Sequence, residues 1–338
     1  MKIINPEAHI LFNEGVTPYQ FIERIGRTCY KSLDKITEDS SVKFVSNLCG
    51  RKHYAMLEHY WVHIRYSNIT IDEFNSDFTR VANTILKTLG GIHDVDKYIH
   101  VTSYNHIYLS APLRFFLELD NIIYDYPSYD IVAETMFVVA KQFPEIISPS
   151  KYYCNHPRAV MMGEYDFCVS LAHDLIRWGN HNHVVSEVMK HRTHTVLFVC
   201  DRGVSHELVR HRPASFAQES TRYCNYAIDR FGNEITVIKP CFYQEYSEEY
   251  DLWKAAMENA EYKYFQLLNA GSTPQEARSV LPNSLKTELI ITANEVEWQH
   301  IIDLRYLGTT GAPHPQMKEV MGLIVPALIE SSDRRLHA

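Results

Sequence analysis

The sequence predicts an α+β fold, in which an antiparallel or mixed sheet is flanked by helices. Residues 59–66 and 193–201 alternate in hydrophobicity and are rich in aromatic and β-branched side chains, as strands are. Residues 17–31 and 244–270 have the capping residues and apolar spacing of helices. The 13 glycines form neither a GxGxxG nor a GxxxxGKS/T pattern, which argues against Rossmann or P-loop phosphate binding.

Composition places the chain among folded proteins. Of its 338 residues, 46% are hydrophobic and 22% are charged, and we expect a single catalytic domain over 1–338. The net charge of −8 opposes general nucleic-acid binding. The start, MKIINPEAHILF, lacks signal-peptide features, and no apolar run is long enough to span a bilayer, so we expect a cytoplasmic protein without membrane segments. The seven cysteines form no CxxC pair and are expected to be reduced thiols.

The first half of the chain begins with two helices. The helix at 17–31 opens with Thr-Pro and repeats apolar residues on one face, and a second helix covers 41–50. The strand at 59–66 follows. From about 70 to 190, helical patterns such as 129–143 and 164–178 alternate with polar loops, and we expect a helical insertion there.

The second half begins with the strand at 193–201. Asp201 is then a candidate cap of a helix that ends near Arg210–Arg212, before Pro213. A third strand is expected at 235–240. Further helices are predicted at 244–270, from Thr273-Pro274 to about Val280, and from about Lys286 to Leu307.

A cationic loop, RHRPASFAQESTRY, covers 210–223. Cations at the end of a helix can simply balance its dipole. The alternation of Gln218, Ser220 and Arg222 indicates more, because in an extended segment these side chains point the same way. Arginine grips phosphate bidentately and a hydroxyl completes the hydrogen bonds, so the loop is a candidate anion receptor. Its two basic groups indicate two anionic ligands.

The same loop resembles the RHR-x7-S signature of the flavin-dependent thymidylate synthase family. Arg210, His211 and Arg212 are followed after seven residues by Ser220, and Thr221-Arg222-Tyr223 resembles the continuation. Further segments that resemble the family are TPYQFIERIGRTCYKS, AMLEH, DRGVSHELVRHR, ARSVLP and TANEVEWQHIIDLR. The resemblance covers most of 17–66 and 191–325.

This resemblance implies an enzyme that methylates dUMP to dTMP. The methylene group comes from methylenetetrahydrofolate and the hydride from reduced FAD, which NADPH regenerates. The resemblance also implies a homotetramer with shared active sites.

Site residues follow from the same resemblance. Those implied to bind the FAD cofactor are Arg210, His211, Arg212, Asn294, His300 and His59. Those implied to bind dUMP are Glu207, Gln218, Ser220, Arg222, Tyr223, Arg278 and Arg305. Arg305 and Ser220 are the implied catalytic pair: Arg305 stabilises charge on the uracil. Ser220 binds the nucleotide, because no Ser-His-Asp order is legible around it.

Three positions depart from the family pattern or leave it open. Glu207 stands where glutamine is common, and near a phosphate it would be repulsive unless paired or protonated. Val296 stands where arginine is typical. The family's Glu-His element has two candidates, Glu58-His59 and Lys190-His191.

On the final helix, Asn294, Trp298, Ile301 and Arg305 are expected to share one face.

Two other classes of function compete with this one. His181, His183, His191 and His194 are close in sequence and could serve a metal-dependent hydrolase. Their spacing matches no compact metal motif, and we expect no metal. An RNA-binding module could use the cationic loop with Tyr223 and Tyr226, but the acidic net charge opposes it.

Overall fold

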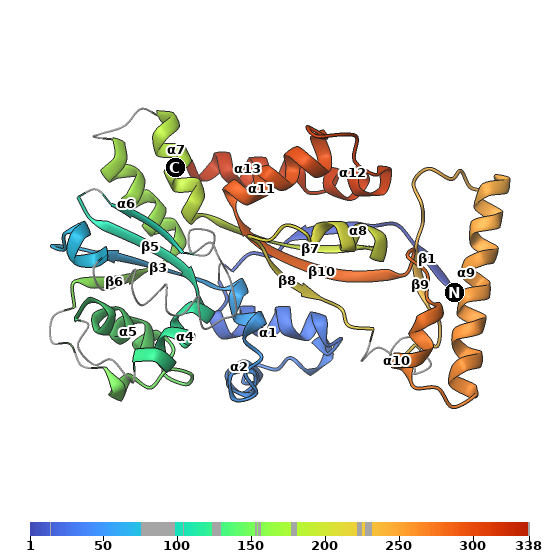
Figure 1. Ribbon diagram of the computed structural model, residues 1–338, viewed down its shortest axis with the longest axis horizontal. Helices are drawn as coiled ribbons and strands as arrows, with labels where there is room; N and C mark the ends of the chain where they lie inside the picture. Colours follow the sequence, from blue (N-terminus) through green and yellow to red (C-terminus); the bar gives the residue numbers. More distant parts are fainter. Residues whose placement is uncertain are drawn as a thin grey trace.

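The computed structural model describes residues 1–13, 15–75, 99–103, 105–123, 130–152, 154, 157–176, 181–221, 225–226 and 232–336. Figure 1 shows two sheets side by side along the longest axis, each with helices above and below it. Both are four-stranded and antiparallel throughout. The α+β prediction with an antiparallel sheet is therefore confirmed.

The first sheet, which we call the signature sheet, has the order β2-β7-β10-β8. Its strands are β2 (Glu7–Ile10), β7 (Thr193–Asp201), β10 (Lys286–Asn294) and β8 (Ser215–Gln218). The strand predicted at 193–201 is confirmed. The helix predicted from Lys286 is wrong as far as Asn294: this run is a central strand, paired along all nine residues with β7. Such a strand is buried on both faces and shows no clean alternation.

Helices cover both faces of the signature sheet (Figure 1). Leu289 and Ile291 pack with α8 (Arg202–Leu208), α11 (Glu295–Ile302), α12 (Pro315–Gly322) and α13 (Val325–Leu336). On the other face Ile290 packs against Phe21 and Ile25 of α1. This alternation follows from the two-residue period of a strand.

Helix α1 (Pro18–Cys29) is the predicted first helix, and α2 (Ser40–Gly50) the second. Thr17 caps α1: its hydroxyl accepts from the Gln20 backbone N–H, and the Gln20 side chain accepts in return from the Thr17 N–H. Both helix predictions are confirmed.

The second sheet, which we call the histidine sheet, has the order β4-β5-β3-β6. Its strands are β4 (His100–Ser103), β5 (Ile107–Pro112), β3 (Trp61–Tyr66) and β6 (Ala159–Met162). Helices α4 (Leu113–Ile123) and α5 (Asp130–Gln142) cover one face, and α6 (Glu164–Ile176) and α7 (His181–His191) the other. The region 70–190 therefore contains three strands as well as helices, which corrects its description as helical. These strands span only four to six residues, too few to show a period clearly.

A smaller unit holds the amino terminus. Strand β1 (Lys2–Ile4) pairs in parallel with β9 (Thr236–Ile238), beside α9 (Glu248–Asn269) and α10 (Pro274–Ala277). Short helical turns are η1 (Leu33–Lys35), η2 (Tyr54–His59), η4 (Pro149–Lys151), η6 (Arg278–Val280) and the π-helical η7 (Asp303–Leu307). Among the helices of the described residues, none is long and apolar enough to cross a membrane.

Candidate active site

The cationic loop leaves the signature sheet through helix α8. Asp201 ends β7, and its side chain accepts from the Val204 N–H at 2.8 Å, which caps the helix as predicted. After the seven residues of α8, Arg210 and Arg212 are exposed, whereas His211 is 5% exposed. The loop therefore offers two guanidiniums to solvent and turns its imidazole inward.

His211 lies at the centre of a charged cluster. Its Nδ1 is 3.2 Å from a carboxylate oxygen of Glu297, and its Nε2 is 3.1 Å from Arg305 Nε. Arginine has no acceptor, so Arg305 donates and Nε2 accepts. The proton of the neutral ring must then be on Nδ1, where it faces Glu297. The cluster thus fixes one tautomer of His211.

Arg305 also satisfies Glu207. Its Nη1 donates to the Glu207 carboxylate at 2.8 Å and its Nη2 to the Glu207 carbonyl at 3.2 Å. The acidic side chain that would repel a nucleotide phosphate is therefore paired in this structure. Glu207 and Arg305, both predicted site residues, are direct partners.

The π-helical turn η7 carries Arg305 into this position. Turns of this kind displace side chains from the regular helical rows and are frequent at functional sites. Gly308 ends the turn at φ 71°, a left-handed conformation that glycine adopts easily. Trp298 and Ile301 instead belong to the buried core. Asn294 precedes the helix as its cap, and Arg305 follows it in η7, so only Trp298 and Ile301 of the expected stripe lie within α11.

The second half of the loop lies along β8. The Gln218 amide donates to Ser205 Oγ at 2.9 Å and to Thr287 Oγ1 at 3.3 Å. Arg278 Nη1 donates to Thr221 Oγ1 at 3.2 Å, so this arginine already lies beside the cationic loop. Ser220, half-buried, lies between these contacts in the chain. Arg222 and Tyr223 lie outside the described residues.

Asn294 and His59 lie where the two sheets meet, and the turn η2 that carries His59 also contacts the cationic loop, because the Ser215 hydroxyl donates to the Glu58 carbonyl at 3.5 Å. The Asn294 side-chain oxygen accepts from the Glu297 N–H at 2.9 Å, and its amide donates to His100 Nε2 at 2.9 Å and to the Lys190 carbonyl at 3.2 Å. His59 is 2% exposed, with Nδ1 2.7 Å from Thr292 Oγ1, and burial lowers its pKa to about 3. Their predicted contact with the cofactor remains a prediction.

Two of the four histidines considered as metal ligands, His191 and His194, have separate partners. His191 uses its two ring nitrogens toward Ser110 and Thr102, and His194 Nε2 lies 2.8 Å from Glu295. Within the described residues, the group with metal-ligand spacing is instead His211, Glu297 and His300. Arg305 donates to the ring nitrogen of His211, and a cation so close disfavours a metal ion.

Sequence reasoning missed several charged residues of these clusters. Glu297 sits one turn before His300 and could have been found from that spacing. Lys31, Lys286 and Glu288 gather around Glu219 from distant parts of the chain, and no local pattern announces them.

Comparison with known proteins finds similarity to one family over part of the chain. Residues 164–330 match the family described as thymidylate synthase complementing protein. The flavin-dependent thymidylate synthase of Pyrococcus furiosus is 35% identical over 119 residues, covering 35% of this chain and 48% of that protein. The enzyme of Geobacter sulfurreducens bearing the same name is 35% identical over 104 residues, or 31% and 43%. The resemblance carried by the cationic loop is therefore confirmed over this stretch.

The extent of these matches is limited. The chain spans about half the length of the curated relatives it matches. Among solved structures, the UMP/dUMP methylase PolB from Streptomyces cacaoi, bound with 5-Br dUMP, is 22% identical over 51% of this chain and 80% of its own, with a TM-score of 0.36. A score this low supports no conclusion about shared structure.

Proposed function

We propose that this protein is a flavin-dependent thymidylate synthase. The observation that carries the proposal is the RHR-x7-S loop: it lies within the matched stretch, and Arg305 is held against its His211. In the proposed reaction the methylene carbon of methylenetetrahydrofolate replaces the hydrogen on C5 of dUMP. Two reducing equivalents from reduced FAD complete the methyl group of dTMP and leave tetrahydrofolate, and NADPH then reduces the flavin again.

The residues around the loop suit FAD in charge and in space. Arg210 and Arg212 are exposed on one short loop and can pair with a diphosphate. A hollow of about 400 Å³ beside α11 is lined by His300, Val296 and Gln299, together with residues of α7. Val296 offers apolar surface where the family pattern has an arginine. When bound, FAD supplies the hydride chemistry, while the protein supplies position and charge.

The nucleotide would be held from the other half of the loop. Arg278 lies against Thr221 and can grip a phosphate at the segment that continues into Arg222 and Tyr223. Gln218 and Ser220 add hydrogen-bonding groups. Arg305 provides a fixed cation for negative charge developing on the uracil, and Glu207 orients its guanidinium until the substrate arrives.

Two further features belong to the proposal. A homotetramer with shared active sites would bring residues of two chains to one site. A cytoplasmic location agrees with the six described cysteines, none of which forms a disulfide.

The test is an anaerobic flavin experiment. Protein reconstituted with FAD is reduced, and the visible flavin absorbance is followed after addition of dUMP and methylenetetrahydrofolate. We expect reoxidation when both are present and none when either is omitted. Tight FAD binding without this reoxidation would indicate a flavoprotein of another activity, and no FAD binding would defeat the proposal.

The role of Ser220 can be separated in the same assay. Ser220→Ala should retain measurable turnover, because a hydroxyl that only positions dUMP contributes about 0.5–1.5 kcal/mol. An inactive variant with normal dUMP affinity would instead indicate a nucleophilic serine.

A further inference from the structure

Three helices of this protein end in the same way. After α1, α2 and α9 the chain passes through a left-handed residue, which is Lys31 (φ 48°), Lys52 (φ 57°) and Gly271 (φ 97°), respectively. In each case the next N–H bonds back five residues, from Ser32 to Arg27, from His53 to Leu48 and from Ser272 to Leu267. This is the Schellman motif, whose left-handed position favours glycine.

A lysine in this conformation is strained, and at position 31 its side chain has a specific partner set. The Lys31 ammonium lies 3.3 Å from Glu219 and also pairs with Glu288. Lys286 approaches the same two carboxylates and lies 3.2 Å from Glu219. We call these four residues the ion quartet. Glycine would be less strained at this position, but it would leave the two carboxylates without the Lys31 ammonium.

The ion quartet is largely removed from water. Glu219 is 3% exposed, and the other three members are between 16% and 18% exposed. Burial alone would lower the pKa of Lys286, but the two carboxylates outweigh it and raise that pKa. Burial would likewise raise the pKa of Glu288, and the two ammonium groups lower it instead. Two cations and two anions thus balance one another.

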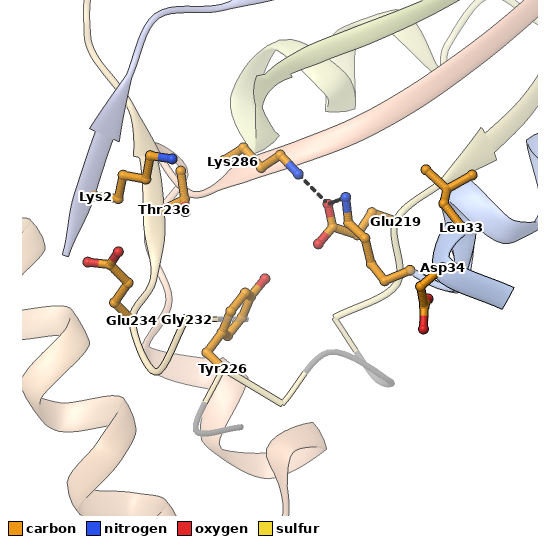
Figure 2. A pocket seen from close by; sticks show the side chains of 10 residues that line it. Lys2, Leu33, Asp34, Glu219, Tyr226, Gly232, Glu234, Thr236 and Lys286 are labelled. Carbon is orange, nitrogen blue, oxygen red and sulfur yellow. Dashed lines mark hydrogen bonds and ion pairs between the residues drawn. The ribbon is translucent and has the colours of Figure 1, made fainter. Parts of the chain in front are cut away.

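Glu219 is the member of the ion quartet that belongs to the cationic loop, where it directly precedes Ser220. Its backbone N–H donates to the Glu288 carbonyl at 2.8 Å, which extends the strand pairing beyond β8. Lys31, Glu219 and Lys286 also line a cavity of about 420 Å³. Figure 2 shows Lys286 and Glu219 meeting on one side of it, with Tyr226 and Glu234 opposite.

We propose that Lys31 is a positioning residue that holds Glu219, and through it Ser220 and Thr221, in the conformation that receives the nucleotide. Without Lys31, Lys286 alone would face two carboxylates, and Glu219 would be drawn toward water along with the loop. Lys31 lies outside the matched stretch 164–330, so the amino-terminal helix would complete a site built by that stretch. The binding part of this inference rests on the proposed function.

Lys52 supplies a matched control. It has the same motif and the same left-handed backbone, but its side chain is exposed, and among the described residues it has no ion pair. Lys31→Gly and Lys52→Gly relieve the same backbone strain, and only the first removes a charge from the quartet. Lys31→Arg keeps the charge.

The first measurement needs no ligand: amide hydrogen exchange in 215–221 of the full chain. We expect faster exchange at Glu219 and Ser220 in Lys31→Gly, and wild-type exchange in Lys52→Gly and Lys31→Arg. Equal exchange in all four proteins, or equal acceleration in both glycine variants, would overturn the proposal. If Lys31→Gly does not fold, Lys31→Met, which keeps the backbone and the aliphatic stem, is measured in its place.

The second measurement is the dissociation constant for dUMP, with that for FAD as reference. Losing a charge-assisted contact should weaken dUMP binding by Lys31→Gly about tenfold or more, while FAD binding stays close to that of wild type. An unchanged dUMP constant would contradict the role of Lys31. If wild-type protein fails to bind dUMP, the proposed function fails, and the exchange experiment still decides whether Lys31 holds the loop.

Discussion

The signature sheet and the histidine sheet have the same strand number and the same antiparallel pairing, but the polar clusters beside them differ. Around the signature sheet lie ion pairs, such as Arg305 with Glu207 and Lys286 with Glu219. The histidine sheet buries neutral imidazoles: His63, His100 and His191 are each at most 9% exposed. Ion pairs such as Arg158 with Glu134 also lie beside the histidine sheet, which in addition holds a hydrogen-bonded chain of buried imidazoles.

The buried chain of the histidine sheet can be assigned proton by proton. The Thr102 hydroxyl donates to the Glu187 carboxylate, so it must accept from His191 Nε2. His191 Nδ1 then accepts from the Ser110 hydroxyl, whose oxygen accepts from His63 Nδ1. Both imidazoles are neutral and every link has one donor. A fully satisfied neutral network avoids the cost of burying charge.

The difference separates two tasks. The proposed anionic ligands, dUMP and FAD, would need cations near the surface, where Arg210, Arg212 and Arg278 lie. A sheet that only supports these cationic residues is more stable when its buried polar groups are neutral and hydrogen-bonded. We therefore expect substitutions in the signature sheet to affect binding and turnover, and those in the histidine sheet to affect stability and its dependence on pH.

Arg192→Leu should give the largest change in stability, because this arginine is the buried charge where the two sheets meet. It is 2% exposed and lies 3.1 Å from Glu295, itself 4% exposed. Removing one partner of such a pair costs about 3–5 kcal/mol of unfolding free energy. Urea unfolding measures this loss of unfolding free energy. Lys254→Ala is the control, because the exposed pair of Lys254 with Glu258 should contribute under about 0.5 kcal/mol. An equal loss of unfolding free energy in both variants would show that the buried pair of Arg192 and Glu295 contributes no more than an exposed one.

Arg305→Ala should separate turnover from stability. Removing a cation that stabilises developing charge lowers kcat by about 10²–10³. The pair with Glu207 is partly exposed, so the unfolding free energy should fall by less than about 1 kcal/mol. Steady-state kinetics and urea unfolding of the same variant test both values. Normal kcat would remove Arg305 from the catalytic role.

Acidification should destabilise the protein through its buried histidines. Burial, and then Lys190, lower the pKa of His100 to about 4, and burial also lowers the pKa of His63 and His191. Between pH 6.5 and about 4 the unfolded chain binds protons that the folded chain excludes, so stability falls as pH falls. Each histidine contributes about 1.4 kcal/mol per pH unit in its window. His100→Gln should flatten the dependence measured by urea unfolding between pH 7 and 5, and an unchanged slope would contradict the assignment.

Ser110→Ala should have the smallest effect of the four. It leaves His63 Nδ1 and His191 Nδ1 without the hydroxyl that joins them, at a cost of about 1–3 kcal/mol. Turnover per folded molecule should remain that of wild type. If Ser110→Ala kept its stability but lost turnover, the histidine sheet would contribute to activity, contrary to this prediction.

Strong local signals made part of this structure predictable. The caps Thr17 and Asp201, and the alternation over 193–201, identified α1, α8 and β7. Strand β10 was missed because it is buried on both faces and runs directly into α11, so the apolar residues of the helix follow those of the strand without a break. The candidate site residues come from several segments that resemble the family, but their pairings, such as Arg305 with Glu207, join segments about 100 residues apart that no local pattern connects.

If the cationic loop serves the methylation of dUMP, as proposed, the enzyme should form dTMP in a single-turnover reaction. Protein with reduced FAD is mixed anaerobically with dUMP and methylenetetrahydrofolate, and the nucleotides are separated and identified by mass. We expect the wild-type protein to form dTMP in an amount equal to the flavin that is reoxidised. Arg305→Ala should form almost no dTMP over the same time. Reoxidised flavin with unchanged dUMP, or equal product from both proteins, would contradict it.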